Sequence, residues 1–372
     1  MDEKIMSMED NQSLEGTASL PTEAEMPDPA FAACLADWHR RSARDLPWRR
    51  DRDPYHVWVS EIMLQQTTIG AVIGYYERFI RELPTVAALA ACPDDRLMKL
   101  WEGLGYYSRA RHLKEAAVCL IEQGRTNLPA DYDALRALPG IGAYTAGAIA
   151  SMAFDLPYPA VDGNVLRIMA RLSACRADVM KTATRRFFEK TLTDLLRSAG
   201  GPPPGLFNEG LMELGEVICL PHGEALCGKC PIAGYCRGCH LGVQNDLPVR
   251  ILKNKRRIEK KTVFLIETAD GIVLHRREDT GLLAGLYEFP NAEGHLSPEE
   301  AKSFLMKAGT EAETLMPLPS ARHLFSHIEW QMTGYRVQAS RMTTAGWFTV
   351  SQDELGGVYA VPGAFRAYRK LV

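Results

Sequence analysis

The stretch Leu138-Pro-Gly-Ile-Gly-Ala-Tyr-Thr-Ala-Gly-Ala148 decides the fold of this chain. Its proline and glycines, Gly140 and Gly142 among them, predict a tight turn, and a helix is expected to start at residue 143. Residues 131–138 predict a short helix before the turn, so the unit is helix, hairpin, helix. A helix that begins at a glycine turn directs backbone N–H groups and the positive end of its dipole outward, which suits a phosphate. Simple packing is the common alternative for a lone glycine turn.

A second stretch, Pro159-Ala-Val-Asp-Gly-Asn-Val-Leu-Arg167, follows the hairpin. Asp162 precedes a helix that is expected to begin near Asn164, and an isolated aspartate in that place is most often an N-cap. The apolar approach, the glycine after the aspartate and the nearby hairpin together favour a carboxylate that is directed at a ligand.

Glu61 is the one acid inside the apolar segment Val57-Trp-Val-Ser-Glu-Ile-Met-Leu-Gln-Gln-Thr67. A lone glutamate in such a helix usually faces water. If it faces inward, burial would raise its pKa and let it carry a proton at neutral pH. Two carboxylates in different environments would then supply an acid and a charge stabiliser.

Composition describes an ordinary globular chain of 372 residues, with 46% hydrophobic and 24% charged residues. The net charge of −3 includes a balance of −6 in residues 1–25, which leaves a mildly basic +3 for the remainder. Nucleic acid would therefore be attracted by local basic patches and not by the net charge of the whole chain. No apolar run is long enough to span a membrane and no secretory core is present, so a cytoplasmic protein without membrane partners is expected.

Five of the nine cysteines are crowded between residues 219 and 239. The spacing Cys219-x7-Cys227-x2-Cys230-x5-Cys236 gives four thiolates within eighteen residues, which can enclose a tetrahedral zinc ion or a [4Fe–4S] cluster. The spacing alone favours neither zinc nor the iron–sulfur cluster clearly.

The fold class expected is a multidomain protein: an all-α helix-hairpin-helix domain with a cysteine loop, followed by an α+β domain. Residues 1–27 predict a disordered acidic tail and 28–245 the helical domain, with the hairpin at about 131–150 and the cysteine loop at 219–236. Residues 246–261 form a basic segment, expected as a linker or an exposed first strand. Residues 262–372 predict strands at 262–266, 272–275, 328–337 and 346–350 and a helix that Ser297 caps.

These motifs together resemble the adenine DNA glycosylases of the MutY family, within the helix-hairpin-helix glycosylase superfamily. The resemblance runs from about Asp45 to the C-terminus and includes residues 60–67, Trp101-Glu-Gly-Leu-Gly-Tyr-Tyr-Ser-Arg109, the hairpin and the cysteine loop. It implies excision of adenine mispaired with 8-oxoguanine or guanine in double-stranded DNA, after the base is flipped out of the duplex.

The resemblance also implies roles for individual residues. Glu61 would protonate adenine at N7, Asp162 would stabilise the oxocarbenium-like sugar, and Tyr144 and Asn164 would position these groups. Bifunctional relatives similar to endonuclease III carry a lysine where this chain has Tyr144, so a monofunctional glycosylase without a Schiff-base lyase step is expected.

The DNA-contacting residues implied by the resemblance come from three places. Leu64, Gln66 and Tyr106 would form a wedge between stacked bases. Gly140 and Gly142 would hold the DNA backbone, and hairpin carbonyls would hold a monovalent cation. The segment 323–327 would sense 8-oxoguanine, through Phe325, Ser326 and His327.

The resemblance favours a [4Fe–4S] cluster on Cys219, Cys227, Cys230 and Cys236. This chain departs from the family pattern in one respect: seven residues separate Cys219 from Cys227, where the family usually has six. A fifth cysteine, Cys239, lies close by in the sequence. The last domain resembles a Nudix domain, but residues 297–303 lack the glutamate-rich helix that would hold magnesium, so no nucleotide hydrolysis is expected.

Two competing readings stay open at this point. One is another glycosylase of the superfamily, acting on oxidised pyrimidines or on thymine mismatches. The other is a non-catalytic protein that marks lesions, against which the presence of both Glu61 and Asp162 argues. A monomer is expected.

Overall fold

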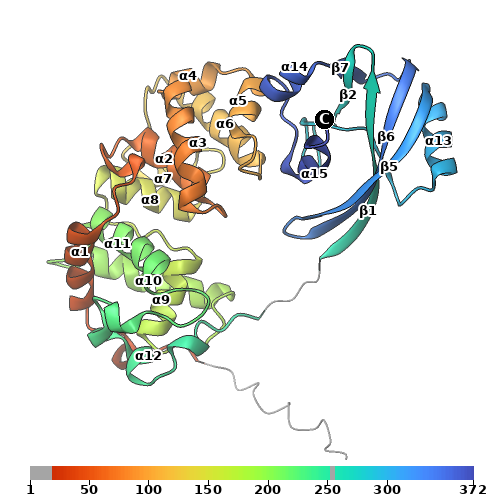
Figure 1. Ribbon diagram of the computed structural model, residues 1–372. Helices are drawn as coiled ribbons and strands as arrows, with labels where there is room; N and C mark the ends of the chain where they lie inside the picture. The colour runs from red at the N-terminus through yellow and green to blue at the C-terminus, as the bar shows by residue number, and fades with distance from the viewer. Residues whose placement is uncertain (1–18, 252–255) are drawn as a thin grey trace, which may run out of the picture. The chain divides into compact units, whose positions relative to one another are not determined.

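The computed structural model describes residues 19–251 and 256–372, which form two compact units (Figure 1). Among the described residues, unit 1 contains 19–61 and 127–251, and unit 2 contains 62–126 and 256–372. The predicted tail at 1–27 falls largely outside the described residues. The helical region is therefore divided between the units, because the chain leaves unit 1 within one helix and returns to it at residue 127.

Unit 1 is all helical in its described part. Its helices are α1 (Ala30–Ser42), α2 (Pro54–Leu64, which continues into unit 2), α7 (Tyr132–Arg136), α8 (Ala143–Phe154), α9 (Gly163–Leu172), α10 (Thr182–Arg197), α11 (Pro204–Val217) and α12 (Arg237–His240). The predicted hairpin helices are thus present as α7 and α8.

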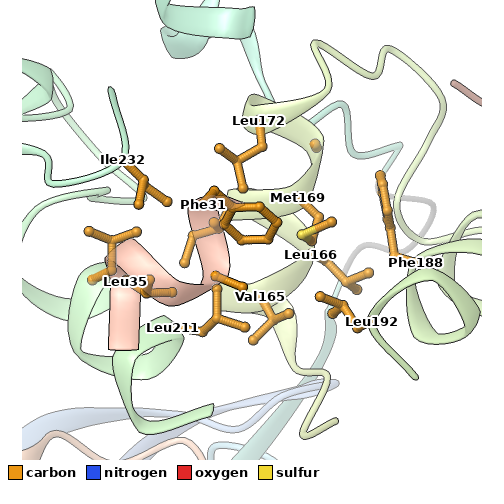
Figure 2. Close-up of a cluster of buried hydrophobic side chains, with 14 of the residues drawn as sticks. Phe31, Leu35, Val165, Leu166, Met169, Leu172, Phe188, Leu192, Leu211 and Ile232 are labelled. Carbon is orange, nitrogen blue, oxygen red and sulfur yellow. The ribbon is translucent and has the colours of Figure 1, made fainter. Parts of the chain in front are cut away.

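Helix α9 is the centre of the unit 1 core. Its residues from Val165 to Leu172 are all buried, and they pack against α1, α10 and α11. Figure 2 shows the labelled side chains of these helices pointing toward one another. Burial of aliphatic and aromatic side chains stabilises such a core by about 1.5–3 kcal/mol per large residue. Three cysteines, Cys219, Cys230 and Cys236, pack against the same core.

Unit 2 combines four helices with an α+β domain. The helices are α3 (Ile69–Glu82), α4 (Val86–Ala91), α5 (Asp94–Trp101) and α6 (Ser108–Glu122). Glu102, directly after α5, accepts a hydrogen bond from the Val361 N–H at 3.0 Å and pairs with Lys99 at 2.8 Å and with Arg369. These polar contacts join the helices to the C-terminal domain within this unit.

The C-terminal domain is built on one mixed sheet with the strand order β3-β2-β1-β6-β5. Its elements are β1 (Arg257–Thr268), β2 (Gly271–Arg276), β3 (Tyr287–Glu288), β4 (Asn291–Glu293), α13 (Pro298–Lys307), β5 (Thr310–Leu324), β6 (Ile328–Met342), β7 (Trp347–Val350), α14 (Gln352–Gly357) and α15 (Arg366–Arg369). Strands β1 and β6 are parallel, and the other pairs are antiparallel.

Both faces of this sheet are covered. Phe264 and Ile266 of β1 face α13, where Ala301 and Leu305 are fully buried. Val263 and Leu265 face the other way, toward the C-terminal helices α14 and α15. The alternation follows from the two-residue period of a strand. Figure 1 shows α13 and α15 on opposite sides of the sheet.

Two local differences from the sequence expectations have clear causes, and one open alternative is decided. Helix α2 ends at Leu64, three residues before the expected end, because the chain turns sharply there. Strand β1 starts at Arg257, so the end of the basic segment is an exposed first strand, one of its two expected forms, and its pairing with β6 extends to Ile328. Strand β5 was not predicted: it is a mostly exposed edge strand interrupted by irregular register and prolines, so it lacks an apolar alternation.

Candidate active site

The hairpin before α8 is a type II turn. The Ile141 N–H donates to the Leu138 carbonyl at 3.2 Å, and Gly140 has a φ of +72°, which glycine adopts without strain. Leu138 and Ile141 are buried and anchor the turn. Gly142 is the N-cap of α8 and has no side chain to accept from the first N–H groups of the helix. The turn and the helix start are therefore present where the sequence predicts them, and phosphate binding there stays a prediction.

Glu61 is buried in unit 1, with 4% of its surface exposed. Tyr144 favours the charged form of this carboxylate, and the Tyr144 hydroxyl lies 3.9 Å from Met212 Sδ. The Oε2 atom of Glu61 has no hydrogen-bond partner among the described residues. Burial raises the pKa of Glu61 to about 7; the charge of Asp162 adds to this rise and Tyr144 opposes it. Glu61 thus faces inward and can hold a proton at neutral pH.

Asp162 is the N-cap of α9, which is the most common role of an aspartate directly before a helix. Its Oδ1 accepts from the N–H groups of Asn164 and Val165, each at 2.8 Å, and its Oδ2 accepts from Asn164 Nδ2 at 2.9 Å. These three bonds hold the carboxylate in one orientation. Burial raises the pKa of Asp162 above its usual value, and the hydrogen bonds oppose the rise. Capping and a directed carboxylate are therefore compatible here.

Helix α8 packs closely on the segment that precedes Asp162. A Cβ on Gly147 would overlap the carbonyl of Pro159, so only glycine permits this approach. Tyr144 lies one turn earlier on the same helix. Burial raises the pKa of the Tyr144 phenol well above its usual value, and the charges of Glu61 and Asp162 raise it further. The structure therefore brings Glu61, Tyr144 and Asp162 together, from three segments of unit 1.

Arg167 connects this site to the cysteine loop. Its Nη1 donates to Asn164 Oδ1 at 2.9 Å, its Nη2 to the Gly215 carbonyl at 2.9 Å and its Nε to the Cys219 carbonyl at 2.8 Å. A chain of hydrogen bonds therefore runs from Asp162 through Asn164 and Arg167 to Cys219. No role for Arg167 follows from the sequence, because nothing in the sequence distinguishes a buried arginine on α9 from a solvated one.

Other charged groups surround Glu61 and were also missed. Glu213 accepts from Arg49 at 2.9 Å and from Arg44 at 2.5 Å. Burial alone would raise the pKa of Glu213, but the bonds and charges of these two arginines lower it below its usual value. Arg49 also lowers and Glu209 raises the pKa of Glu61, so the pKa values of Glu61 and Glu213 are shifted in opposite directions.

The three predicted wedge residues belong to unit 2: Leu64 ends α2, and Gln66 and Tyr106 lie on the turns that follow α2 and α5. Gln66 and Tyr106 are exposed and have φ values of +60° and +47°, which are uncommon for residues other than glycine. Such conformations persist only where the surroundings impose them, and they cluster at functional sites.

Arg109 imposes the conformation of both turns. Its guanidinium is buried and donates to five carbonyls, those of Ile62, Met63, Gln65, Leu104 and Gly105, at 2.6–3.2 Å. Burial lowers the pKa of Arg109 to about 10, which keeps it charged at neutral pH. The same group lies 5.5 Å from the centre of the Tyr106 ring. Arg109 closes the motif 101–109, but the sequence gives no sign that it joins two turns.

We expect Arg109→Ala to destabilise the protein by on the order of 3 kcal/mol and to weaken binding to duplex DNA, because five carbonyls lose their shared donor. Arg109→Lys should recover only part of the loss, since an ammonium lacks the planar fork. Denaturant unfolding and duplex titration measure the two effects. Arg125→Ala, an exposed arginine beyond α6, is the control for stability. Equal stability of Arg109→Ala and the unaltered chain would contradict the role.

Comparison with known proteins decides the family. A model of the HhH-GPD superfamily base excision DNA repair proteins matches residues 59–194. The chain is 34% identical over 409 residues to the adenine DNA glycosylase of Rattus norvegicus, covering 92% of this chain and 78% of that protein. It is 33% identical to the adenine DNA glycosylase of Homo sapiens, covering 91% and 74%. The chain belongs to the adenine DNA glycosylase family. It is therefore a hydrolase of N-glycosyl bonds that binds DNA and acts in base excision repair.

Further matches include another relative, a second domain and a solved structure. The adenine DNA glycosylase of Buchnera aphidicola subsp. Baizongia pistaciae is 32% identical, covering 80% of this chain and 83% of that protein. A model of the NUDIX domain matches residues 262–371. The solved structure of a thermostable thymine-DNA glycosylase has a TM-score of 0.49 and 27% identity, covering 57% of this chain and 96% of that chain. The predicted family, enzyme class and two-part fold are confirmed, and the reading as a non-catalytic marker is wrong.

The segment 325–327 of the glycosylase is the tip of the β5–β6 hairpin. The Phe325 N–H donates to the Ile328 carbonyl at 2.8 Å, and Ser326 and His327 are exposed at the tip. The hydroxyl groups of Ser326 and Tyr106 lie 2.6 Å apart. The structure thus places one predicted wedge residue beside the predicted 8-oxoguanine sensor, within unit 2.

The cysteine loop of the glycosylase brings its thiols to one cavity. Cys219, Cys227, Cys230, Cys236 and Cys239 all line it, together with apolar groups and Arg171. Arg171 Nη1 donates to the Cys219 sulfur at 3.1 Å, and burial raises the pKa of Cys230 to about 12. Among the described residues, no three His, Cys, Asp or Glu side chains are gathered closely enough to hold a single ion. A set of thiols with a cation nearby suits a thiolate-bound iron–sulfur cluster.

The extra residue in the first cysteine gap lies in an exposed turn. The Leu226 N–H donates to the Ile218 carbonyl at 2.9 Å, which closes the loop, and Gly223 has a φ of +73° at its tip. The extra residue is therefore accommodated in the exposed loop between Cys219 and Cys227. Elsewhere in the described chain, no helix has the length and apolarity to cross a membrane.

Proposed function

We propose that this glycosylase removes adenine opposite 8-oxoguanine or guanine by acid-assisted hydrolysis and leaves an abasic site. The observation that carries the proposal is the buried Glu61, whose pKa of about 7 is set by burial beside Asp162. A carboxylic acid that holds its proton near neutral pH is suited to protonate a leaving base.

The proposed reaction uses the four groups of unit 1 in turn. Glu61 donates its proton to N7 of the flipped adenine, which makes the base a neutral leaving group. The bond from C1′ to N9 then breaks, and the negative charge of Asp162 stabilises the oxocarbenium-like sugar until water adds at C1′ and gives its extra proton to the Glu61 carboxylate. The Tyr144 hydroxyl orients Glu61, and Asn164 holds Asp162 through the bond from Nδ2.

Unit 2 supplies the contacts that open the duplex and test the opposite base. Leu64, Gln66 and Tyr106 separate the stacked bases, and apolar and aromatic wedges of this kind unstack a base step for a few kcal/mol. Phe325, Ser326 and His327 contact 8-oxoguanine. The hairpin of unit 1, with Gly140 and Gly142, holds the DNA backbone, and its carbonyls bind a monovalent cation.

The cofactor proposed for the cysteine loop is a [4Fe–4S] cluster on Cys219, Cys227, Cys230 and Cys236. The shared cavity and the Arg171 contact support it. When bound, the cluster would supply a fold-stabilising crosslink and a one-electron redox centre. The hydrogen-bond chain from Cys219 through Arg167 to Asn164 would then position Asp162.

The direct test compares duplexes that contain A:8-oxoguanine, A:G, T:G or an oxidised pyrimidine. We expect release of free adenine from the first two, with strand cleavage only after alkali, because Tyr144 offers no amine for a Schiff base. Cleavage without alkali, or preference for T:G or the oxidised pyrimidine, would contradict the proposal.

Ser326 offers a test of recognition that leaves the chemistry intact. We expect Ser326→Ala to reduce the preference for A:8-oxoguanine over A:G by about tenfold, since one hydrogen bond is worth about 1 kcal/mol and the Tyr106 contact is also lost. The ratio of single-turnover rates on the two duplexes measures it. Ser297→Ala, at the N-cap of α13, is the matched control. An unchanged ratio would remove Ser326 from the sensor.

No nucleotide hydrolysis is proposed for the Nudix-like domain. Helix α13 carries two glutamates in its first turn, and Glu300 accepts from the Ser297 N–H at 2.8 Å as part of a capping box. Release of pyrophosphate from 8-oxo-dGTP would contradict this. The protein is proposed to act as a monomer.

A further inference from the structure

Glu102 fixes the start of the turn that carries Tyr106 to the C-terminal domain, and only 15% of the Glu102 side chain is exposed. Its Oε1 accepts from the Val361 N–H at 3.0 Å and from Arg369, while its Oε2 pairs with Lys99 at 2.8 Å. Lys99 belongs to α5, whereas Val361 and Arg369 follow the sheet near the end of the chain. One carboxylate is therefore shared between the helices of unit 2 and the C-terminal domain.

The partners of Glu102 are themselves held by backbone groups. Lys99 Nζ donates to the carbonyls of Leu355 and Tyr359 at 3.3 and 3.0 Å. Arg369 Nη2 donates to the same Leu355 carbonyl at 3.1 Å. An exposed ion pair would hold two elements weakly, but in this network each charge is largely shielded from water and also bonds a backbone group. The network therefore holds α5 and the C-terminal domain in one register.

The same turn meets the C-terminal domain again at its tip. The hydroxyls of Tyr106 and Ser326 lie 2.6 Å apart, beside the end of the β5–β6 hairpin. The two glycines between these contacts have φ values of +103° and +70°, and no side chain there helps to fix the path of the turn. Arg109 fixes the middle of the turn to the helices through the carbonyls of residues 104 and 105. The contacts of Glu102 and Tyr106 fix it to the C-terminal domain.

We propose that Glu102 is a positioning residue for recognition of the opposite base. It holds the turn so that Tyr106 and Ser326 meet that base in one geometry, and it acts through these two residues without touching the substrate. Loss of the carboxylate leaves three donors without their acceptor and frees the start of the turn. The preference for 8-oxoguanine over guanine then falls, while the groups that break the glycosidic bond are unchanged. This inference rests on the proposed function.

The test is the ratio of single-turnover excision rates on A:8-oxoguanine and A:G duplexes, measured below saturation so that DNA binding is included. We expect Glu102→Gln to lower this ratio about fivefold, because a charged network that holds the turn is lost at a distance from the base. Arg369→Gln breaks the same network from the C-terminal domain and should lower the ratio equally, which covers poor folding of Glu102→Gln. Arg369→Lys keeps the charge and should retain most of the ratio.

Ser326→Ala separates positioning from general damage to the fold. Because Glu102 acts through the contact of Tyr106 with Ser326, Glu102→Gln/Ser326→Ala should have the same ratio as Ser326→Ala alone. Glu82→Gln is the matched control: Glu82 pairs with Arg96 of α5, within the helices, and its loss should leave the ratio unchanged. A second signal comes from 2-aminopurine placed beside 8-oxoguanine, whose fluorescence rises when the wedge unstacks it. Glu102→Gln should give a smaller rise.

An unchanged ratio in both Glu102→Gln and Arg369→Gln would overturn the inference. An equal fall in Glu82→Gln would also overturn it, because it would indicate a general loss of stability. A further fall in the double variant would place Glu102 outside the contact of Tyr106 with Ser326. These three outcomes leave the proposed function intact when the unaltered enzyme releases adenine. An unaltered enzyme that releases no adenine from either duplex defeats the proposed function and this inference together.

Discussion

Asp162→Asn is expected to excise adenine at least ~10³-fold more slowly than the unaltered enzyme, because the charge that faces the sugar cation is lost in a site with little water. Asparagine is also a good N-cap, so the bonds to the N–H groups of Asn164 and Val165 should persist. The effect should therefore fall on the rate and not on folding or on binding to the mismatch. Single-turnover kinetics on A:8-oxoguanine duplex measure the rate.

The controls for Asp162→Asn separate charge from capping. Asp28 also binds a backbone N–H at a helix start, that of Ala30 at 2.8 Å, and lies at the exposed beginning of α1. Asp28→Asn should excise adenine at the unaltered rate. Thermal unfolding and duplex titration should give nearly the same values for Asp162→Asn and the unaltered chain. Undiminished turnover by Asp162→Asn would remove Asp162 from the proposed mechanism.

Glu61→Gln is expected to lower the excision rate about 10³-fold, because the amide keeps the shape of the side chain but has no proton to give. The pH profile identifies the acid more sharply. Burial raises the pKa of Glu61 to about 7, so the rate of the unaltered enzyme should fall about tenfold per pH unit above that value. The residual rate of Glu61→Gln should lack this alkaline decline. A decline that persists in Glu61→Gln would assign it to another group.

The same titration affects the stability of the fold, where Glu61→Gln is expected to be favourable and not harmful. The folded protein holds the Glu61 proton more tightly than the ordinary pKa of 4.5 allows, so its contribution to stability is complete below pH 4.5 and is lost as pH rises through about 7. Glu61→Gln avoids that loss. Above pH 7 we expect it to be more stable than the unaltered chain by up to about 3 kcal/mol, from 1.36 kcal/mol per pKa unit. Denaturant unfolding at pH 6 and pH 8 tests this difference.

Local sequence signals were sufficient for the elements that carry the chemistry. The turn at Gly140 was readable because proline and glycine occupy the positions that a type II turn requires. Asp162 was readable as the start of α9, and Ser297 as the start of α13, because N-caps depend on bonds within three residues. The edge strand β5 was not readable, since an exposed strand with prolines lacks the alternation of a half-buried one.

Long-range contacts could not be inferred in the same way. Arg109 is one of many arginines in the sequence. Three of its five carbonyl partners, those of Ile62, Met63 and Gln65, are 44 to 47 residues away along the chain. The contact between Tyr106 and Ser326 spans 220 residues. The resemblance to a family supplied the names of Tyr106 and Ser326, but not the bond between them.

The sequence by itself determined the hairpin, the helix that Asp162 caps, the crowded cysteines and, through resemblance, the kind of base excision. These depend on backbone conformations and spacings that a few neighbouring residues decide. Only the tertiary structure decided that Glu61 faces inward, since a lone acid in an apolar helix is solvated or buried according to what packs on it. Burial, together with the charge of Asp162, 101 positions away, raises the pKa of Glu61 to about 7, while Tyr144, 83 positions away, opposes the rise.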